Sequence, residues 1–404
     1  MSFEESKYIL DAFTTSMFDS IFSLFSHDLG IDLGTANTLV FIRGKGIAIR
    51  EPSIVARHVR SKKIIAIGTE AKKMLGKTPA SISAIRPLEH GVISDFDGAT
   101  YMLSYYIKQV HEAGRRIPIL ARPRVVVGIP SGVTEVERRA VWEAALTAGA
   151  RECYLIEEPM AAAIGAGVSV FEPTGVMTVD IGGGTTEIAV ISLGGIVVNR
   201  SLKVAGYDMD KAIIHYIRLR HGLVIGEKTA EEVKIKIGSV FRSNIKPKGK
   251  SEKAETKKEE GLMRKWNEVE EETSANVEIV KESKSERVAL IRGRDIESGL
   301  PKSLRINESE IREAIGGVIS QIVDGVMEVI EETPPELTSD ILEHGILLTG
   351  GGSLLRGIDE LIIERTKIPV TIVDDPLTTV CRGCAKLLDD PALLNQVKVT
   401  GGLR

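Results

Sequence analysis

The chain has 404 residues, of which 43% are hydrophobic and 27% are charged, and its formal net charge is −4 at pH 7. This length and composition predict a soluble, globular protein with a sizeable core and two or more domains. The negative net charge argues against nucleic acid as a ligand, and the sequence has neither a zinc-finger spacing nor an interleaved basic and aromatic tract.

The first predicted element is an amphipathic helix within residues 1–27. Apolar residues recur there at helical spacing and include Phe18, Ile21, Phe22 and Phe25. We expect neither a secretory signal nor a transmembrane segment, because a basic leader and a bilayer-long apolar run are both missing. Two alternatives stay open: docking onto protein, or lying in a membrane interface. Met17 is an alternative start.

A motif near the start of the chain recurs in its middle. Residues 31–38 read Ile-Asp-Leu-Gly-Thr-Ala-Asn-Thr, and residues 179–186 read Val-Asp-Ile-Gly-Gly-Gly-Thr-Thr. Each copy follows an apolar run and leads through a second strand to another glycine turn, which predicts two β-meanders and hence two related domains. One copy alone would favour an ordinary turn, but two similarly framed copies favour a shared function.

Glycine-lined turns bring backbone N–H groups close to an anion, so both copies suit phosphate. Asp32 and Asp180 end their strands, and we expect them to face each other across a cleft and hold a hydrated Mg²⁺. The hypothesis from these residues is a nucleotide between two domains.

A second candidate membrane contact is the stretch from Arg115 to Arg124. Its short apolar tip includes Ile119 and Leu120, and arginines flank the tip on both sides. Arginines can meet lipid phosphates while the tip enters the acyl boundary. The alternative, which the loop alone favours, is a tip that packs inward. Two weak anchors in one chain make membrane binding more credible.

A strand over Arg151–Ile156 leads into a helix over Glu157–Gly167, where Pro159 suits a first helical position and small residues permit close backbone packing. Glu158 lies at the start of this helix. A carboxylate there can orient an attacking water, or it can simply be a favourable charge at a helix N-terminus.

A later helix carries Glu231 and Lys234 on one face. Taken alone, this pair favours a solvated ion pair over contacts to a purine and ribose. Residues 243–287 follow with 11 Lys/Arg and 11 Glu and few apolar side chains, which predicts a flexible or helical surface insertion.

The last motif is Gly345-Ile-Leu-Leu-Thr349, followed by Gly350-Gly-Gly-Ser353 and a predicted helix from Leu354. A strand, a glycine turn and a helix N-terminus form an anion site, here without a P-loop lysine. Among the cysteines, Cys153 is expected to be a buried small hydrophobe, and Cys381 and Cys384 lack the second pair of a metal site.

Taken in order, these motifs resemble the actin, Hsp70 and sugar-kinase superfamily. Longer stretches closely resemble the MreB family of rod-shape-determining bacterial actins, from about Asp28 to Leu388. They are Asp32-Leu-Gly-Thr-Ala-Asn-Thr-Leu-Val, Leu155-Ile-Glu-Glu-Pro-Met-Ala-Ala-Ala-Ile-Gly, Asp180-Ile-Gly-Gly-Gly-Thr-Thr-Glu, Arg292-Gly-Arg-Asp with Gly299-Leu-Pro-Lys302, and Leu348-Thr-Gly-Gly-Gly-Ser-Leu-Leu-Arg-Gly357.

The resemblance implies an actin-like, ribonuclease H-like fold around ATP and Mg²⁺. It implies that Glu158 and Thr185 position the hydrolytic water, that Asp32 and Asp180 lie near the metal, and that Ile119, Leu120 and the segment from Met17 to Phe25 bind membrane. The implied nucleotide contacts are Thr35, Ala36, Asn37, Gly182, Gly183, Gly184, Glu231, Lys234, Gly350, Gly351, Gly352 and Ser353.

The resemblance also implies four subdomains. We expect IA over 28–51, 87–164 and 372–395; IB over 52–86; IIA over 165–205 and 302–371; and IIB over 206–301, including the charged insertion 243–287. The insertion departs from the family, which has only a short link there. Tyr207 also departs, because an acidic or small residue is expected after Gly206.

The function implied is a filament-forming ATPase in the cytoplasm, peripheral on the inner face of the membrane. Its partners would be further copies of itself in antiparallel paired protofilaments, the cytoplasmic membrane and cell-wall elongation membrane proteins, through which it organises peptidoglycan synthesis. The alternative is a soluble Hsp70-like chaperone or sugar kinase. An Hsp70 needs a further β-rich peptide-binding domain, and a kinase needs a hydroxyl-activating base that the sequence does not mark.

Overall fold

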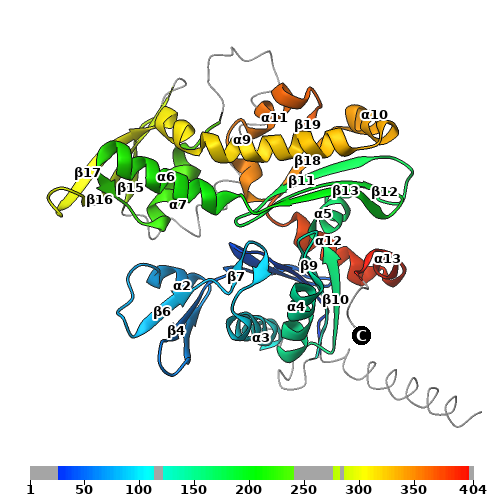
Figure 1. The fold of residues 1–404 in the computed structure, drawn as a ribbon. Helices are drawn as coiled ribbons and strands as arrows, with labels where there is room; N and C mark the ends of the chain where they lie inside the picture. Colours follow the sequence, from blue (N-terminus) through cyan, green and yellow to red (C-terminus); the bar gives the residue numbers. More distant parts are fainter. Residues whose placement is uncertain (1–25, 113–121, 241–275, 283–285, 400–404) are drawn as a thin grey trace, which may run out of the picture. The chain divides into compact units, whose positions relative to one another are not determined.

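The computed structural model describes residues 26–112, 122–240, 276–282 and 286–399. The chain separates into two compact units. The first unit comprises Met1–Thr174, Ile191–Ser201 and Thr378–Arg404, and the second comprises Gly175–Val190 and Leu202–Leu377. Figure 1 shows the fold, with labels on helices and strands of both units.

The main sheet of the first unit has the strand order β10-β9-β1-β2-β3. Strands β1, β9 and β10 run parallel, while β2 is antiparallel to β1 and β3 is antiparallel to β2. The strands span Leu29–Leu33 (β1), Asn37–Ile42 (β2), Gly46–Pro52 (β3), Arg124–Ile129 (β9) and Glu152–Glu157 (β10).

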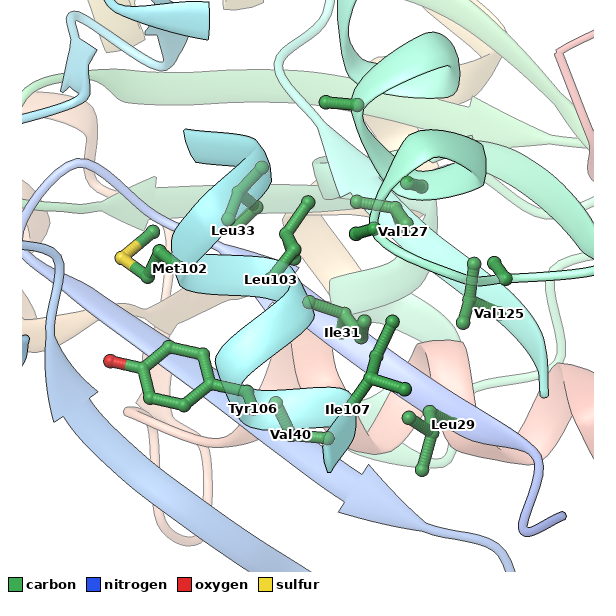
Figure 2. Close-up of a cluster of buried hydrophobic side chains, with 14 of the residues drawn as sticks. Leu29, Ile31, Leu33, Val40, Met102, Leu103, Tyr106, Ile107, Val125 and Val127 are labelled. Atoms are coloured by element: carbon green, nitrogen blue, oxygen red, sulfur yellow. The ribbon is translucent and has the colours of Figure 1, made fainter. Parts of the chain in front are cut away.

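Helices cover this sheet on both faces. One core contains Val125 and Val127 of β9 with Leu103 and Ile107 of α3 (Figure 2), whereas Val126 belongs to a second core with residues of α5 and α12. This alternation follows from the two-residue period of a strand, and it explains why β9 is an unbroken apolar run. The helices are α3 (Phe96–Glu112), α4 (Glu135–Thr147), α5 (Glu158–Ala166), α12 (Thr379–Asp389) and α13 (Pro391–Val397).

A smaller sheet with the order β5-β4-β6 also belongs to the first unit. It packs Ala56 against Ala71 in a small core of its own. The elements are β4 (Val55–His58), β5 (Ile64–Ile67), α2 (Thr69–Met74) and β6 (Ile82–Ile85), and the hairpin β7 (Leu88–Glu89) and β8 (Val92–Ile93) follows them.

The second repeated motif builds a matching five-stranded sheet with the order β13-β12-β11-β18-β19, in which β11, β18 and β19 are parallel. The strands are β11 (Val176–Ile181), β12 (Thr186–Ser192), β13 (Gly195–Leu202), β18 (Ile346–Thr349) and β19 (Val370–Ile372). Strands β11, β12 and β13 correspond in order and position to β1, β2 and β3. The predicted repetition of two β-meanders is therefore confirmed.

Helix α9 (Glu308–Glu332) packs on this second sheet, since a Cβ added at Gly325 would contact Leu202 and Ile188. The capping box of Asn307 and Glu310 begins the helix. The other helices of the unit are α6 (Gly206–His221), α7 (Glu227–Ile237), α10 (Pro335–His344) and α11 (Ile358–Thr366).

A further sheet in the second unit corrects one expectation. Its strands are β14 (Leu223–Val224), β15 (Val277–Glu282), β16 (Arg287–Asp295) and β17 (Pro301–Asn307), with β16 paired to the other three. The expectation of flexible or helical structure was wrong for Val277–Glu282, because β-branched residues between its charges fit a strand. Residues 243–275 and 283–285 of the insertion lie outside the described residues.

The three cysteines are buried. Cys153 is buried in the first core, as expected, and Cys381 and Cys384 are buried on α12. No helix among the described residues is both long enough and apolar enough to cross a membrane.

Candidate functional site

Asp32 lies near the carboxyl end of β1, opposite Leu39 of β2 and Gly128 of β9. Burial of its carboxyl group raises the pKa to about 7. A buried carboxyl with a raised pKa is common at functional sites, because a bound cation can compensate for the lost hydration of the charged form.

The turn that follows Asp32 is held in shape by hydrogen bonds from residues outside it. A Cβ at Gly34 would approach Asn37 O to 2.8 Å, which explains the glycine. Ser53 Oγ donates to Gly34 O at 2.6 Å and lies 2.8 Å from Thr38 Oγ1. The Thr35 hydroxyl accepts a bond of 2.8 Å from Gly91 N–H. Ser53 could not be selected from the sequence, because only the tertiary structure brings it to this turn.

Glu158 is the first residue of α5, directly after β10, and its side chain is 9% exposed. A Cβ built on Gly128 would lie 3.6 Å from Glu158 Cγ. Since Gly128 is also the register partner of Asp32, the two predicted carboxylates flank one glycine at the carboxyl edge of β1, β9 and β10. This edge is where open α/β sheets bind ligands.

The second repeat places Asp180 near the end of β11, opposite Thr349 of β18, with 8% of its surface exposed. Gly350 follows Thr349 with a φ of 78°. A Cβ at Gly350 would overlap Asp180 Oδ1 and would lie 2.5 Å from Ile181 O. The position therefore requires glycine for both its conformation and its close approach to the aspartate.

Backbone hydrogen bonds join the second glycine turn to the start of α6. Gly182 N donates to Thr185 O at 2.9 Å, Gly206 N to Gly182 O at 3.2 Å, and Tyr207 N to Gly183 O at 2.8 Å. Tyr207, the noted departure from the family pattern, thus contributes its backbone to this junction. The Thr185 side chain is mostly buried in the same turn.

Lys234 on α7 reaches the same junction. Its Nζ lies 2.9 Å from Gly206 O and 2.8 Å from Asp210 Oδ1, and Asp210 is 4% exposed. The lysine is therefore part of a mostly buried network rather than a solvated surface pair. Glu231 lies on the same helix. Asp210 could not be selected from the sequence, because only the tertiary structure brings it to Lys234.

The third glycine turn differs from its prediction. Residues Gly351–Leu354 form a 3₁₀-helix, and α11 begins only at Ile358, after Gly357 with a φ of 78°. The expected helix start at Leu354 was wrong, because Leu355 is extended and the left-handed Gly357 redirects the chain. Ser353 Oγ donates to Gly350 O at 2.6 Å and so fixes the turn.

Comparison with known proteins identifies the family. The family model described as "MreB/Mbl protein" matches residues 26–278 and 256–396. The chain belongs to the MreB/Mbl family. It is similar to the cell shape-determining protein MreB of Escherichia coli strain K12, with 46% identity over 370 residues that cover 91% of this chain and 94% of the relative. It is also similar to the cell shape-determining protein Mbl of Bacillus subtilis strain 168, with 41% identity over 377 residues that cover 93% and 100%.

A solved structure of the MreB family supports the fold assignment. MreB5 of Spiroplasma citri bound to ADP matches with a TM-score of 0.76 and 36% identity, covering 92% of this chain and 98% of MreB5. The fold is therefore actin-like, as the sequence predicted, with two related α/β domains. The four subdomain boundaries stay predictions.

Within this MreB/Mbl-family chain, the structure gathers the predicted site residues in two groups. Asp32, the turn from Thr35 to Asn37 and Glu158 lie at the carboxyl edge of the first sheet. The second group lies in the other unit and comprises Asp180, the Gly182–Gly184 turn, Thr185, Lys234 with Glu231, and the Gly350–Ser353 turn. Their roles stay predictions. The predicted membrane residues Phe18, Ile21, Phe22, Phe25, Ile119 and Leu120 lie outside the described residues.

Each unit, taken by itself, carries groups that suit Mg²⁺ or phosphate. Within the described part of the chain, no group of three or more His, Cys, Asp or Glu side chains forms a metal site. A hydrated Mg²⁺ needs fewer protein ligands, since water and phosphate oxygens complete its coordination. A cation would complement the carboxyl group of Asp32, whose pKa is raised. A phosphate would complement the Gly350 turn, which lies against Asp180.

Proposed function

We propose that this protein is an ATP-dependent, filament-forming bacterial actin that binds the inner surface of the cytoplasmic membrane and directs rod cell shape by organising peptidoglycan synthesis. Further copies of the chain, in antiparallel paired protofilaments, and cell-wall elongation membrane proteins are its proposed partners. The relatives from Escherichia coli and Bacillus subtilis carry the name cell shape-determining protein, and MreB5 has been solved with ADP and with AMPPNP.

One observation carries the nucleotide part of this proposal. In each repeat, an aspartate is the second-last residue of a strand, and hydrogen bonds to backbone atoms hold the glycine turn that follows. A Cβ would lie 2.8 Å from Asn37 O at Gly34 and 3.1 Å from Thr185 O at Gly182, so both turns favour glycine. Such turns favour an anion close to backbone N–H groups.

The proposed roles follow this arrangement. Asp32 and Asp180 hold Mg²⁺ through water, and the turns after them bind the phosphates. Glu231, Lys234 and the Gly350–Ser353 turn contact the nucleoside. Mg²⁺ neutralises charge on the phosphates when it is bound. Glu158 and Thr185 orient the hydrolytic water, and burial of Glu158 keeps its carboxylate in one position.

Contacts in the first unit support membrane binding by two segments together. Ser26 Oγ accepts a bond of 2.7 Å from Arg122 N–H, and His27 N–H donates to His111 Nε2 at 3.0 Å. Residue 26 adjoins the amphipathic segment, and residues 111 and 122 bracket the Ile119-Leu120 loop. Both candidate anchors thus join the described chain at one place, so they can reach one lipid surface and gain avidity.

Substitution of Glu158 tests the proposed ATPase. Glu158→Ala should still bind ATP and polymerise, but its phosphate release should fall about 100-fold or more, the range expected when a positioned acid or base is removed. Single-turnover hydrolysis with a separate nucleotide-binding assay measures both effects. The matched control is Glu157→Ala, whose carboxyl lies next in sequence and interacts with Arg138 of α4.

If Glu158→Ala releases phosphate at the wild-type rate, Glu158 does not position the water. If the wild-type protein neither binds nor hydrolyses ATP, the proposal of an ATP-dependent filament fails altogether.

A further inference from the structure

The first sheet has a second edge that the proposed ATPase does not use. Strands β1, β9 and β10 are parallel, so their starts lie together at the edge opposite to Asp32 and Glu158. The turn between β2 and β3 joins them there, because Arg43 N–H donates to Asp28 O at 3.0 Å. This amino edge is also where Ser26 and Arg122 meet.

Positive charge gathers at the amino edge of a chain whose net charge is negative. The Asp28 carboxylate faces three guanidinium groups, with its nearest oxygen 2.6 Å from Arg124, 3.6 Å from Arg43 and 4.0 Å from Arg151. Hydrogen bonding to Asp28 raises the pKa of Arg124. Two further carboxylates adjoin these groups, Asp389 beside Arg43 and Glu152 beside Arg124. Lys45 contacts His27, and the backbone of Arg122 contacts Ser26, so both residues adjoin the cluster. With these two cations, the cluster has more cations than carboxylates.

The cations of this cluster differ in how far they are exposed to solvent. Arg124 and Arg151 are partly buried against Asp28 and hold the strand starts in place. Lys45 and Arg122 are exposed, and the Lys45 ammonium lies 3.1 Å from a ring nitrogen of His27, which has no negative charge to neutralise it. Lys45 stands between Gly44 and Gly46, both with positive φ, at the tip of the β2–β3 turn.

We propose that Lys45 and Arg122 form a binding site for the phosphate groups of anionic phospholipids, at the base of the two candidate anchor segments. The inference rests on the proposed membrane function and deepens it by naming the lipid class. Its basis is charge complementarity: exposed cations adjoin the two points where the candidate anchors leave the described chain. Guanidinium and ammonium groups bind phosphate through charge-assisted hydrogen bonds. Inserted apolar segments would give affinity for any bilayer, while these cations select the anionic one.

The test is cosedimentation of the full chain with two kinds of vesicle, pure phosphatidylcholine and a mixture of phosphatidylcholine with phosphatidylglycerol. The variant Lys45→Gln/Arg122→Gln should bind the mixed vesicles about 25-fold more weakly than wild type, since each cation near an anionic surface contributes about fivefold. Its binding to pure phosphatidylcholine should not change. Added salt should weaken wild-type binding to mixed vesicles more than variant binding.

The matched control is Lys63→Gln/Lys77→Gln, which removes the same charge from exposed positions near the small sheet. It should bind both vesicle types as wild type does, and equal melting temperatures should show that both variants are folded. Equal binding of wild type and Lys45→Gln/Arg122→Gln to mixed vesicles would overturn the headgroup site alone. An equal loss in the control would also overturn it, in favour of overall charge. If wild type binds neither vesicle, the proposed membrane function fails, and the inference fails with it.

Discussion

At the residue scale, the fold changes the pKa of the Asp32 carboxyl group. Its position between β2 and β9 removes water from the carboxyl group and raises the pKa to about 7. In the unfolded chain the pKa is near the ordinary value of 3.8. The folded protein therefore binds the extra proton between these values, and the associated stability is lost as the pH rises through about 7.

This linkage predicts the behaviour of Asp32→Asn in the ligand-free protein with EDTA. The amide mimics the protonated carboxyl group, so the variant should melt higher than wild type at pH 8, and the difference should shrink toward pH 5. Thermal melts at both pH values measure this. Asp324→Asn, on the exposed surface of α9, should change the melting temperature little. A variant that melts lower than wild type at pH 8 would show that ionised Asp32 stabilises the empty fold.

At the scale of elements, the contact between α5 and α12 holds Glu158 in place. A Cβ at Gly165 would overlap Thr379 O, and a Cβ at Gly383 would overlap Ala161 O, so the two backbones touch. Lys386 Nζ donates to Ile164 O at 2.7 Å at the end of α5, and burial lowers the pKa of this lysine. Glu158 is the first residue of α5. The contact with α12 holds α5 in place and therefore also positions the proposed catalytic carboxylate.

Two helical glycines with different surroundings test this contact. Gly383→Ala should lower the free energy of unfolding by about 1–3 kcal/mol, the usual cost of overpacking, and should slow ATP hydrolysis by moving α5. Gly316→Ala on α9 has open space around its Cβ and should raise stability by about 0.5–1 kcal/mol. Urea denaturation and phosphate release measure both variants. Equal effects of the two substitutions would contradict a tight α5–α12 contact.

The elements also show what the sequence could predict. The strands around Asp32 and Asp180 were predictable, because apolar runs bounded by glycine turns are local signals. Close backbone packing of the helix after Glu158 was expected from its small residues, but α12 as its partner was not, since that contact joins distant parts of the chain. Strand β15 was missed because its charges concealed its β-branched residues, and the 3₁₀-helix after Gly350 was missed because a run of glycines permits several conformations.

Among site residues, Asp32, Asp180 and Glu158 could be selected from motifs, and the structure places each at a strand end or helix start beside a glycine. Ser53 and Asp210 could not be selected from motifs. Ser53 acts through a hydrogen bond to Gly34, and Asp210 acts through an ion pair with Lys234. Both contacts form only in the tertiary structure.

At the scale of the whole molecule, two edges of the first sheet carry different groups of functional residues. The carboxyl edge of β1 and β9 holds Asp32 and Glu158, and the amino edge holds the cationic cluster beside both candidate anchors. A filament built from such subunits could therefore bind a membrane through one edge while its nucleotide residues stay at the other.

The most direct measurement is negative-stain microscopy of the purified protein on monolayers that contain phosphatidylglycerol, with Mg-ATP and without nucleotide. We expect paired filaments on the lipid with Mg-ATP and their loss without nucleotide. Discrete molecules in both conditions, in protein that is shown to bind ATP, would contradict an ATP-dependent membrane filament.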